Sequence, residues 1–267
     1  MKILFFGDVV ARSGREVLKA AIAKLVPEHS PDFIVVNGEN ASHGNGLLPE
    51  MAQEMLDNGV DVISLGNHAW DQKQIVPFLA TTTRIIRPAN YPDSPMFKAP
   101  GRGVTVVQSQ KRPELQLGVI QVMGRVFMDA LDDPFRTAER EAERLDELGV
   151  RVIVVDFHGE ATSEKLAFSY YMDGKISAVI GTHTHVQTSD EQVLPGGTAT
   201  ITDVGMCGCF DSVIGVKKEI SVQKFITKRP VRYEPAEGRG GYSCVIIDVD
   251  ESSGKCRSIE RLFERVL

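Results

Sequence analysis

Two histidines separated by one residue, His183 and His185, follow directly on the apolar run 178–180. Side chains at positions i and i+2 beyond a strand can point two imidazoles at one region of space. The chain contains six histidines, and His68 and His158 also follow apolar runs. Because imidazole is the commonest side-chain ligand of metals, this recurrence predicts a metal site.

Carboxylate and amide side chains stand at the ends of three of these runs, so that five apolar runs end in potential metal ligands. In an open α/β sheet, ligands bind beyond the carboxyl ends of the strands, and the five endings can therefore meet at one rim. Carboxylate, amide oxygen and imidazole suit manganese, iron or zinc, and no thiolate is offered. The residues of these types that stand at the five endings include Asp8, Glu39, Asn40, Asn67, His68, His158, His183 and His185.

Each candidate ligand taken alone has a simpler explanation. An aspartate after a strand, such as Asp8, is typically a turn or helix-cap residue, and the same holds for Glu39 and Asn40. His158 alone would be read as a hydrogen-bonded core histidine. The conjunction favours the metal site, because independent turn residues have no reason to recur at the same place on five strands.

The elements that must position these side chains alternate in the first ninety residues between short apolar runs and amphipathic segments. This is the pattern of βαβ units, and it predicts a parallel sheet with helical crossovers. The expected strands are 3–6, 33–36, 62–65 and 85–86, and the expected helices are 15–25, 49–56 and 72–79.

The middle of the chain continues with further α/β units, and the C-terminal third reads as mostly β. Cys207 and Cys209 are expected to be small residues in a glycine-rich loop. We expect a single domain, 1–267, in which two mixed sheets pack face to face with helices outside. The expected strands are 103–107, 117–122, 150–157, 177–181, 199–203, 219–226, 242–249 and 256–263, and the helices are 134–148 and 162–172.

Composition narrows the classes of partner. The formal net charge of −6 over 267 residues argues against electrostatic binding of long nucleic acid duplexes. No apolar run approaches membrane-spanning length, and the early Asp8 does not fit a signal peptide. Four cysteines without paired spacing suggest reduced thiols and a cytoplasmic location. The sequence leaves a homo-oligomer open.

The ordered blocks resemble those of calcineurin-like metallophosphoesterases over residues 7–185. The blocks are Gly7-Asp8, Gly38-Glu39-Asn40, Gly66-Asn67-His68, His158, and Gly181-Thr182-His183-Thr184-His185. Longer strings, 66–71, 158–165 and 202–206, resemble the YmdB-like bacterial branch. This resemblance implies a four-layer α/β/β/α sandwich and a hydrolase of phosphodiester bonds in cyclic nucleotides, notably 2′,3′-cyclic ones.

The resemblance also implies a dinuclear site with two metal ions, for which iron is favoured and manganese or zinc are alternatives. One metal would take Asp8, Glu39, Asn40 and His185, and the other Glu39, Asn67, His158 and His183. The common superfamily pattern has a histidine two residues after the first aspartate. Here Val10 stands in that place, and the resemblance suggests that Asn40 supplies the missing ligand.

The implied mechanism is attack on phosphorus by a hydroxide that bridges the metals, with His68 as the proton donor to the leaving oxygen. The alternative is that His68 is a structural histidine at the rim. Arg12 and Arg15 could reach a substrate phosphate or be solvated cations, and Trp70 could stack on a base or pack in the core. Glu160 could orient a ligand histidine or begin a helix.

Three other functions are consistent with parts of this pattern. A phosphomonoesterase or protein phosphatase would use the same ligands, since specificity lies in the surrounding loops. A non-catalytic scaffold is disfavoured because every ligand position except Val10 carries a competent donor. A di-iron oxidoreductase is disfavoured because the Glu-x-x-His helix motifs are absent.

Overall fold

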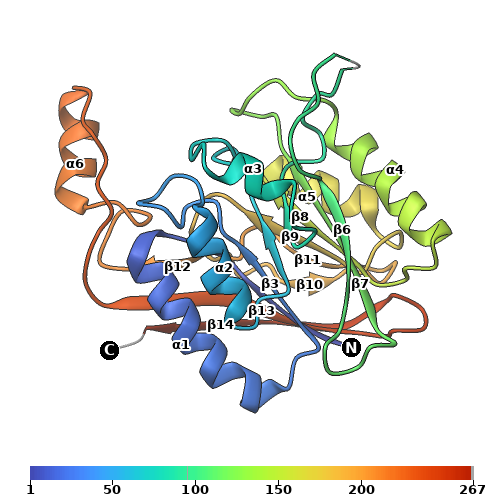
Figure 1. Ribbon diagram of the computed structural model, residues 1–267. Helices are drawn as coiled ribbons and strands as arrows, with labels where there is room; N and C mark the ends of the chain where they lie inside the picture. The colour runs from blue at the N-terminus through green and yellow to red at the C-terminus, as the bar shows by residue number, and fades with distance from the viewer. Residues whose placement is uncertain (95, 266–267) are drawn as a thin grey trace.

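Two mixed β-sheets form the centre of the molecule in the computed structural model, which describes residues 1–94 and 96–265 (Figure 1). The strand order in the first sheet is β2-β12-β13-β1-β3-β4-β5, and β14 pairs with β13. Strands β1, β3, β4 and β5 are parallel, whereas β13 is antiparallel to β1. The bounds are β1 Lys2–Phe6, β2 Asp8–Val9, β3 Phe33–Asn37, β4 Val62–Ser64, β5 Ile85–Ile86, β12 Met206–Cys209, β13 Gly240–Val249 and β14 Cys256–Arg265.

The second sheet has the order β10-β11-β9-β8-β7-β6. Its central strands β7, β8, β9 and β11 are parallel, and the edge strands β6 and β10 are antiparallel to their neighbours. The bounds are β6 Val104–Gln108, β7 Gln116–Met123, β8 Ile153–His158, β9 Ala178–Thr182, β10 Gln192–Val193 and β11 Ala199–Ile201.

Both faces of the central strands are buried, and their side chains alternate between two apolar layers. In β1, Leu4 and Phe6 pack toward the helices of the first sheet, while Ile3 and Phe5 pack between the two sheets. A third apolar cluster lies between the second sheet and its helices. The predicted four-layer α/β/β/α arrangement of two packed mixed sheets is confirmed.

Helices cover the outer face of each sheet. Helices α1 (Ala11–His29), α2 (Pro49–Asp57) and α3 (Ile75–Leu79) pack on the first sheet, and α4 (Pro134–Glu147) and α5 (Thr162–Met172) pack on the second. Figure 1 shows α1 and α2 on one side of the molecule and α4 on the other. Compared with the sequence prediction, α1 is longer at both ends and α3 begins later. No helix in the described part of the chain is both long and apolar enough to span a membrane.

The prediction of a strand over 219–226 is wrong, because this segment lies in helix α6 (Lys218–Thr227). Val222, Phe225 and Ile226 are exposed, and Ser221 is the one buried residue of the helix. Figure 1 shows α6 standing away from both sheets. A segment without a neighbouring strand can pair its own backbone groups only as a helix, and this outweighs the short apolar alternation.

The expectation of a loop at Cys207 and Cys209 is also wrong. Both lie in β12, which pairs with β13 on one side and with the short strand β2 on the other. Both side chains are buried. The partners of β12 are distant in the sequence, so a glycine between two small residues gave no local sign of a strand.

The parallel strands end level with one another, and this brings the candidate ligands together. Phe6 of β1 is paired with Val36 of β3, and His158 of β8 is paired with Thr182 of β9. The blocks that begin at Asp8, Glu39 and His183 therefore leave their sheets at the same rim, as the rule for open α/β sheets requires.

Candidate metal centre

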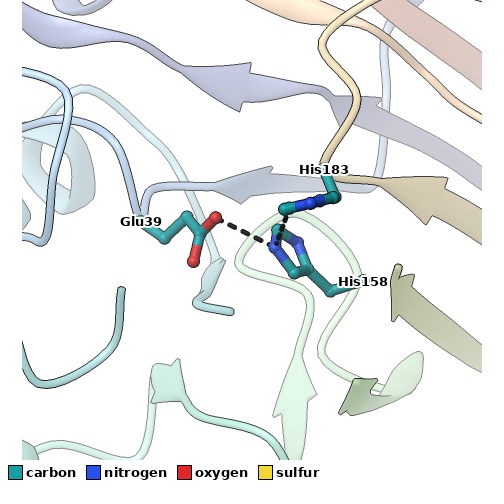
Figure 2. A group of neighbouring side chains, drawn as sticks. All are labelled: Glu39, His158 and His183. Atoms are coloured by element: carbon teal, nitrogen blue, oxygen red, sulfur yellow. Dashed lines mark hydrogen bonds and ion pairs between the residues drawn. The ribbon is translucent and has the colours of Figure 1, made fainter. Parts of the chain in front are cut away.

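Four side chains from both sheets meet in a compact buried group, called here the Glu39 cluster: Glu39, Asn67, His158 and His183. Nε2 of His158 lies 2.9 Å from Oε1 of Glu39, 2.9 Å from Oδ1 of Asn67 and 3.0 Å from Nδ1 of His183. Figure 2 shows Glu39 and His183 both approaching the same nitrogen of the His158 ring. Ligand atoms of Glu39, His158 and His183 all lie within 4.8 Å of one another, a spacing that one metal ion could bridge.

The proton arrangement in the Glu39 cluster fits a cation. The Thr182 hydroxyl donates to Oδ1 of Asp156 at 2.7 Å, so it must accept a hydrogen bond from Nδ1 of His158 at 2.9 Å. With a cation bound, His158 would keep its proton on Nδ1 and direct a lone pair from Nε2 toward the centre of the group. The four ligand atoms would then all be electron-pair donors, which is the arrangement that a divalent ion satisfies.

A second, looser group consists of Asp8, Asn40 and His185, called here the Asp8 group. Nε2 of His185 lies 3.3 Å from Oδ1 of Asn40 and 3.8 Å from Oδ1 of Asp8. The Asp8 carboxylate is fully buried, and its Oδ1 has no hydrogen-bond partner among the described residues. A buried carboxylate oxygen without a partner is costly, and a bound cation would remove that cost. The residues present therefore fit a metal here too.

The other ring nitrogens of the candidate histidines are held by polar neighbours. Nδ1 of His185 is 2.8 Å from the carbonyl oxygen of Ile214, and Nε2 of His183 is 3.1 Å from Oε2 of Glu160. Each contact places a proton on the outer nitrogen and leaves the inner nitrogen as a lone-pair donor. Glu160 therefore has the geometry of an orienting residue, one of the two readings that the sequence left open.

The turn that carries His183 and His185 is held by a buried ion pair. Oδ2 of Asp203 accepts hydrogen bonds from the Thr184 backbone nitrogen (3.0 Å) and hydroxyl (2.7 Å). Lys165 is also buried and donates to the same oxygen at 2.8 Å. His183 and His185 both have positive φ angles, 99° and 65°. This conformation is unfavourable for residues with a side chain, so the contacts of Asp203 help to stabilise it.

Glycine is required where the Asn67 block approaches the Glu39 cluster. A Cβ atom on Gly66 would lie 2.5 Å from both Oε2 of Glu39 and Nε2 of His158. Any larger residue at this position would push the loop away from the cluster. The backbone nitrogen of His68 also donates to Oε2 of Glu39 at 2.9 Å, which ties the loop to the Glu39 carboxylate.

The pKa values of the carboxylates in the two groups shift in opposite directions. In the Glu39 cluster, burial opposes the charges of Glu39 and His158, but their mutual attraction prevails. It lowers the pKa of Glu39 to about 2 and raises the pKa of His158 to about 9. Burial, together with the neighbouring His158, lowers the pKa of His183 to about 3. In the Asp8 group, burial raises the pKa of Asp8 to about 6.

His68 lies at the edge of the Glu39 cluster with its ring partly exposed. Its Nδ1 is 2.8 Å from Oδ2 of Asp71, three residues further on. This contact places the ring proton on Nδ1 and leaves the lone pair on Nε2. Sequence reasoning assigned no role to Asp71, although its spacing from His68 was a usable signal.

The three residues predicted as substrate contacts each have another partner in the structure. Arg12 pairs with Glu16 at the surface, at 2.7 Å. Arg15 donates to the carbonyl oxygen of Ala41 at 2.5 Å, so it holds the loop that follows Asn40. Trp70 packs on Tyr91 with ring centroids 5.8 Å apart and contacts the core of the first sheet. The geometry thus matches the simpler readings of Arg12 and Trp70.

Comparison with known proteins gives the same family as the motifs. A profile described as "YmdB-like protein" matches residues 4–262. The chain belongs to the YmdB-like family. The 2′,3′-cyclic-nucleotide 2′-phosphodiesterase of Bacillus subtilis (strain 168) is 45% identical over 264 residues, which are 98% of this chain and 96% of that protein.

Two solved structures share the fold over nearly the whole chain. A hypothetical protein from Thermus thermophilus has a TM-score of 0.90 at 38% identity, covering 99% of each chain. A phosphatase from Mycoplasma pneumoniae has a TM-score of 0.91 at 31% identity, covering 99% of this chain and 93% of that one. The predicted family, fold class and enzyme class, a phosphoric ester hydrolase, are confirmed.

Proposed function

We propose that this protein is a dinuclear metal-dependent phosphodiesterase that hydrolyses small cyclic nucleotides, with 2′,3′-cyclic nucleotides as the preferred class. The observation that carries the proposal is the meeting of seven metal-competent side chains from both sheets at one rim. The 2′,3′-cyclic-nucleotide phosphodiesterase of B. subtilis supports the substrate class, because that relative matches the chain from end to end.

The ligand sets follow from the two groups. Glu39, Asn67, His158 and His183 would hold one ion, and Asp8, Asn40 and His185 the other, with Glu39 shared between them. Bound metal ions of this kind supply a nucleophilic hydroxide at neutral pH and withdraw charge from the phosphoryl oxygens. Asp8 and Glu39 are the two carboxylates of the set, so two divalent ions leave positive charge for an anionic phosphodiester.

His68 would donate the proton that the leaving ribose oxygen needs. Its Nδ1 proton is committed to Asp71, and a protonated Nε2 can donate to the ribose oxygen as the bond from phosphorus to that oxygen breaks. Asp71 keeps the ring in one orientation and stabilises the imidazolium before transfer. The backbone link from His68 to Glu39 fixes the ring relative to the ligand groups.

The decisive experiment combines metal analysis of the purified protein with a panel of four substrates. The panel contains 2′,3′-cyclic AMP, 3′,5′-cyclic AMP, a nitrophenyl phosphodiester and a nitrophenyl phosphomonoester. We expect two ions per chain, with iron as the proposed metal, and fastest turnover of 2′,3′-cyclic AMP. Two bound ions without hydrolysis of any substrate would contradict the enzyme, and preference for the monoester would favour a phosphomonoesterase.

The cellular setting is a further part of the proposal. Cys207, Cys209, Cys244 and Cys256 are all unpaired, and all are buried. Burial raises the pKa of Cys207 to about 12, so this thiol stays protonated and unreactive. Four buried and unpaired thiols suit a reducing compartment, and we propose a cytoplasmic location.

A further inference from the structure

A cavity of about 380 Å³ opens directly beside the Asp8 group, and its wall includes His185 itself. We call it the His185 cavity. It lies where the loop after β12 passes the ends of β13 and β14, and Phe210, Ile214 and Phe263 contribute to its lining. A volume in this range is typical of sites that hold a small molecule. Because His185 belongs to the Asp8 group and also lines the cavity, a ligand bound at the Asp8 group could extend into the cavity.

Aromatic and aliphatic side chains dominate one wall of the His185 cavity. The rings of Phe210 and Phe263 meet edge to face, with centroids 5.1 Å apart and planes at 82°. Ile214 and Phe263 are about half exposed, at 48% and 52%. Exposed apolar side chains gathered beside a polar centre mark a binding surface for a flat apolar group rather than for a phosphate.

Polar groups are also present at defined places in the same cavity. Ser243 lines it, and its buried Oγ has no hydrogen-bond partner among the described residues. Arg261 lies on another side and pairs with Glu191 at 2.7 Å. A buried hydroxyl without a partner is unfavourable in a folded protein, and a ligand with donors and acceptors on its edge would satisfy it.

A second cavity near the ligand groups has a different character. It measures about 510 Å³ and is lined by charged residues that include Arg12 and Lys217. These cations are already paired, Arg12 with Glu16 and Lys217 with Glu234, each at 2.7 Å. Within the described part of the chain, no phenylalanine, tyrosine or tryptophan lines this cavity, so a flat heteroaromatic group would lack there the stacking partners that Phe210 and Phe263 offer.

We propose that the His185 cavity binds the nucleobase of the substrate, with Phe210 and Phe263 packing on the base and Ser243 bonding to its edge. The proposal rests on the proposed function, since it needs the phosphate at the ligand groups. The cyclic phosphate and the base of one nucleotide are joined by a single ribose, and His185 stands between the two binding regions. The cavity then explains how a site built for phosphate distinguishes a nucleotide from other diesters.

The test compares 2′,3′-cyclic AMP with ribose 2′,3′-cyclic phosphate, which carries the same reacting group without a base. For the wild-type enzyme we expect kcat/KM to be roughly tenfold or more higher with the base, as stacking on an aromatic side chain provides. Phe210→Ala and Phe263→Ala should each lose most of this preference, with little change in kcat/KM for the abasic substrate. Activity on the abasic substrate also shows that each variant is folded.

Two control variants make the outcome specific. Phe225→Ala removes an exposed aromatic ring from α6, outside the cavity, and should keep the preference for the base. Lys217→Met alters the charged cavity and should also keep it. Loss of the preference in Lys217→Met, with the phenylalanine variants unchanged, would place the base in the charged cavity and overturn the proposal.

The remaining outcomes separate this proposal from the proposed function. Equal turnover of both substrates by the wild-type enzyme would contradict a base-binding cavity and leave the phosphodiesterase intact. Failure to hydrolyse either substrate, with both metals bound, would contradict the phosphodiesterase itself. Ser243→Ala adds a finer test, because it should raise KM for 2′,3′-cyclic AMP and leave the abasic substrate unaffected.

Discussion

The two groups of proposed ligands differ in how closely their atoms are assembled. In the Glu39 cluster, His158 lies within 3.0 Å of three other ligand atoms. In the Asp8 group, the corresponding distances from His185 are 3.3 and 3.8 Å, and one carboxylate oxygen of Asp8 has no partner among the described residues. Without a metal, a protonated His158 can hold the first group together by hydrogen bonds from Nε2, whereas the second group keeps a carboxylate oxygen that a cation would satisfy. We therefore expect the Glu39 cluster to bind its ion more tightly.

The strongest test of this comparison is Glu39→Gln, because Glu39 is the residue that would serve both ions. We expect the variant to lose both metals and to lower kcat/KM by about 10³-fold or more. Metal analysis after gel filtration, combined with turnover of 2′,3′-cyclic AMP, measures both effects. Glu50→Gln, at an exposed position, is the matched control. A variant that keeps one full equivalent of metal would show that Glu39 is not shared.

Separate replacement of His183 and His185 should show which metal ion each of the two groups binds. His183→Ala is expected to remove the ion of the Glu39 cluster, and His185→Ala the ion of the Asp8 group. Loss of a residue that hydrogen-bonds to a metal ligand typically lowers metal affinity by about 10–100-fold, and loss of the ligand itself should lower it more. Titration with a chelator would show two steps in the wild-type protein and one in each variant. Equal loss of both ions in either variant would mean that the two groups form one coupled unit.

A variant of His68 distinguishes a role in proton transfer from a role as a metal ligand. His68→Ala should keep both ions and lower kcat by about 10²–10⁴-fold, the usual contribution of a general acid. Asp71→Asn should give a smaller loss of the same kind, because the ring is then less firmly oriented. Loss of metal together with activity in His68→Ala would instead make His68 a ligand.

Asp203 acts on both groups through one turn, and its replacement should therefore not distinguish them. Thr184, which Asp203 holds, stands between His183 and His185. We expect Asp203→Asn to weaken both metal sites by similar factors, about 10–100-fold each. Because this change leaves Lys165 buried and unpaired, the double variant Asp203→Asn/Lys165→Met controls for loss of stability. An effect confined to one ion would contradict this role.

The sequence predicted the convergence of the ligands but not the contacts that orient them. Asp8, Glu39, Asn67, His158 and His183 lie at or shortly after the ends of apolar runs, and the rule that parallel strands present their ends at one rim is enough to group them. Asp203 and Ile214 reach the site from loops 18 and 29 residues after His185 (203 − 185 and 214 − 185). No local pattern indicates such contacts, because they depend on the packing of distant segments.

The two wrong predictions of secondary structure, at β12 and at α6, have the same cause. β12 was mistaken for a loop because its partners β2 and β13 lie far away in the sequence. Helix α6 was mistaken for a strand because Ile220 and Val222 alternate with polar residues over a short stretch. In both cases the presence or absence of a neighbouring strand decided the structure, and local propensity did not.

Stability without metal gives a further test, in which the two groups should respond with opposite signs. Burial raises the pKa of Asp8 to about 6, so protonation of Asp8 favours the folded state, fully so below pH 4, and this contribution is lost as the pH rises through 6. Asp8→Asn should therefore stabilise the metal-free protein at pH 7.5, by up to about 3 kcal/mol, and the gain should vanish toward pH 4.

Glu39 has a lowered pKa, so the stability that its ionised carboxylate contributes is present above about pH 4.5. Glu39→Gln should therefore destabilise the metal-free protein at pH 7.5. Urea unfolding of the chelator-treated variants at pH 5.0 and 7.5 measures both effects. Shifts of the same sign in the two variants would show that the Glu39 cluster, like the Asp8 group, depends on its metal for assembly.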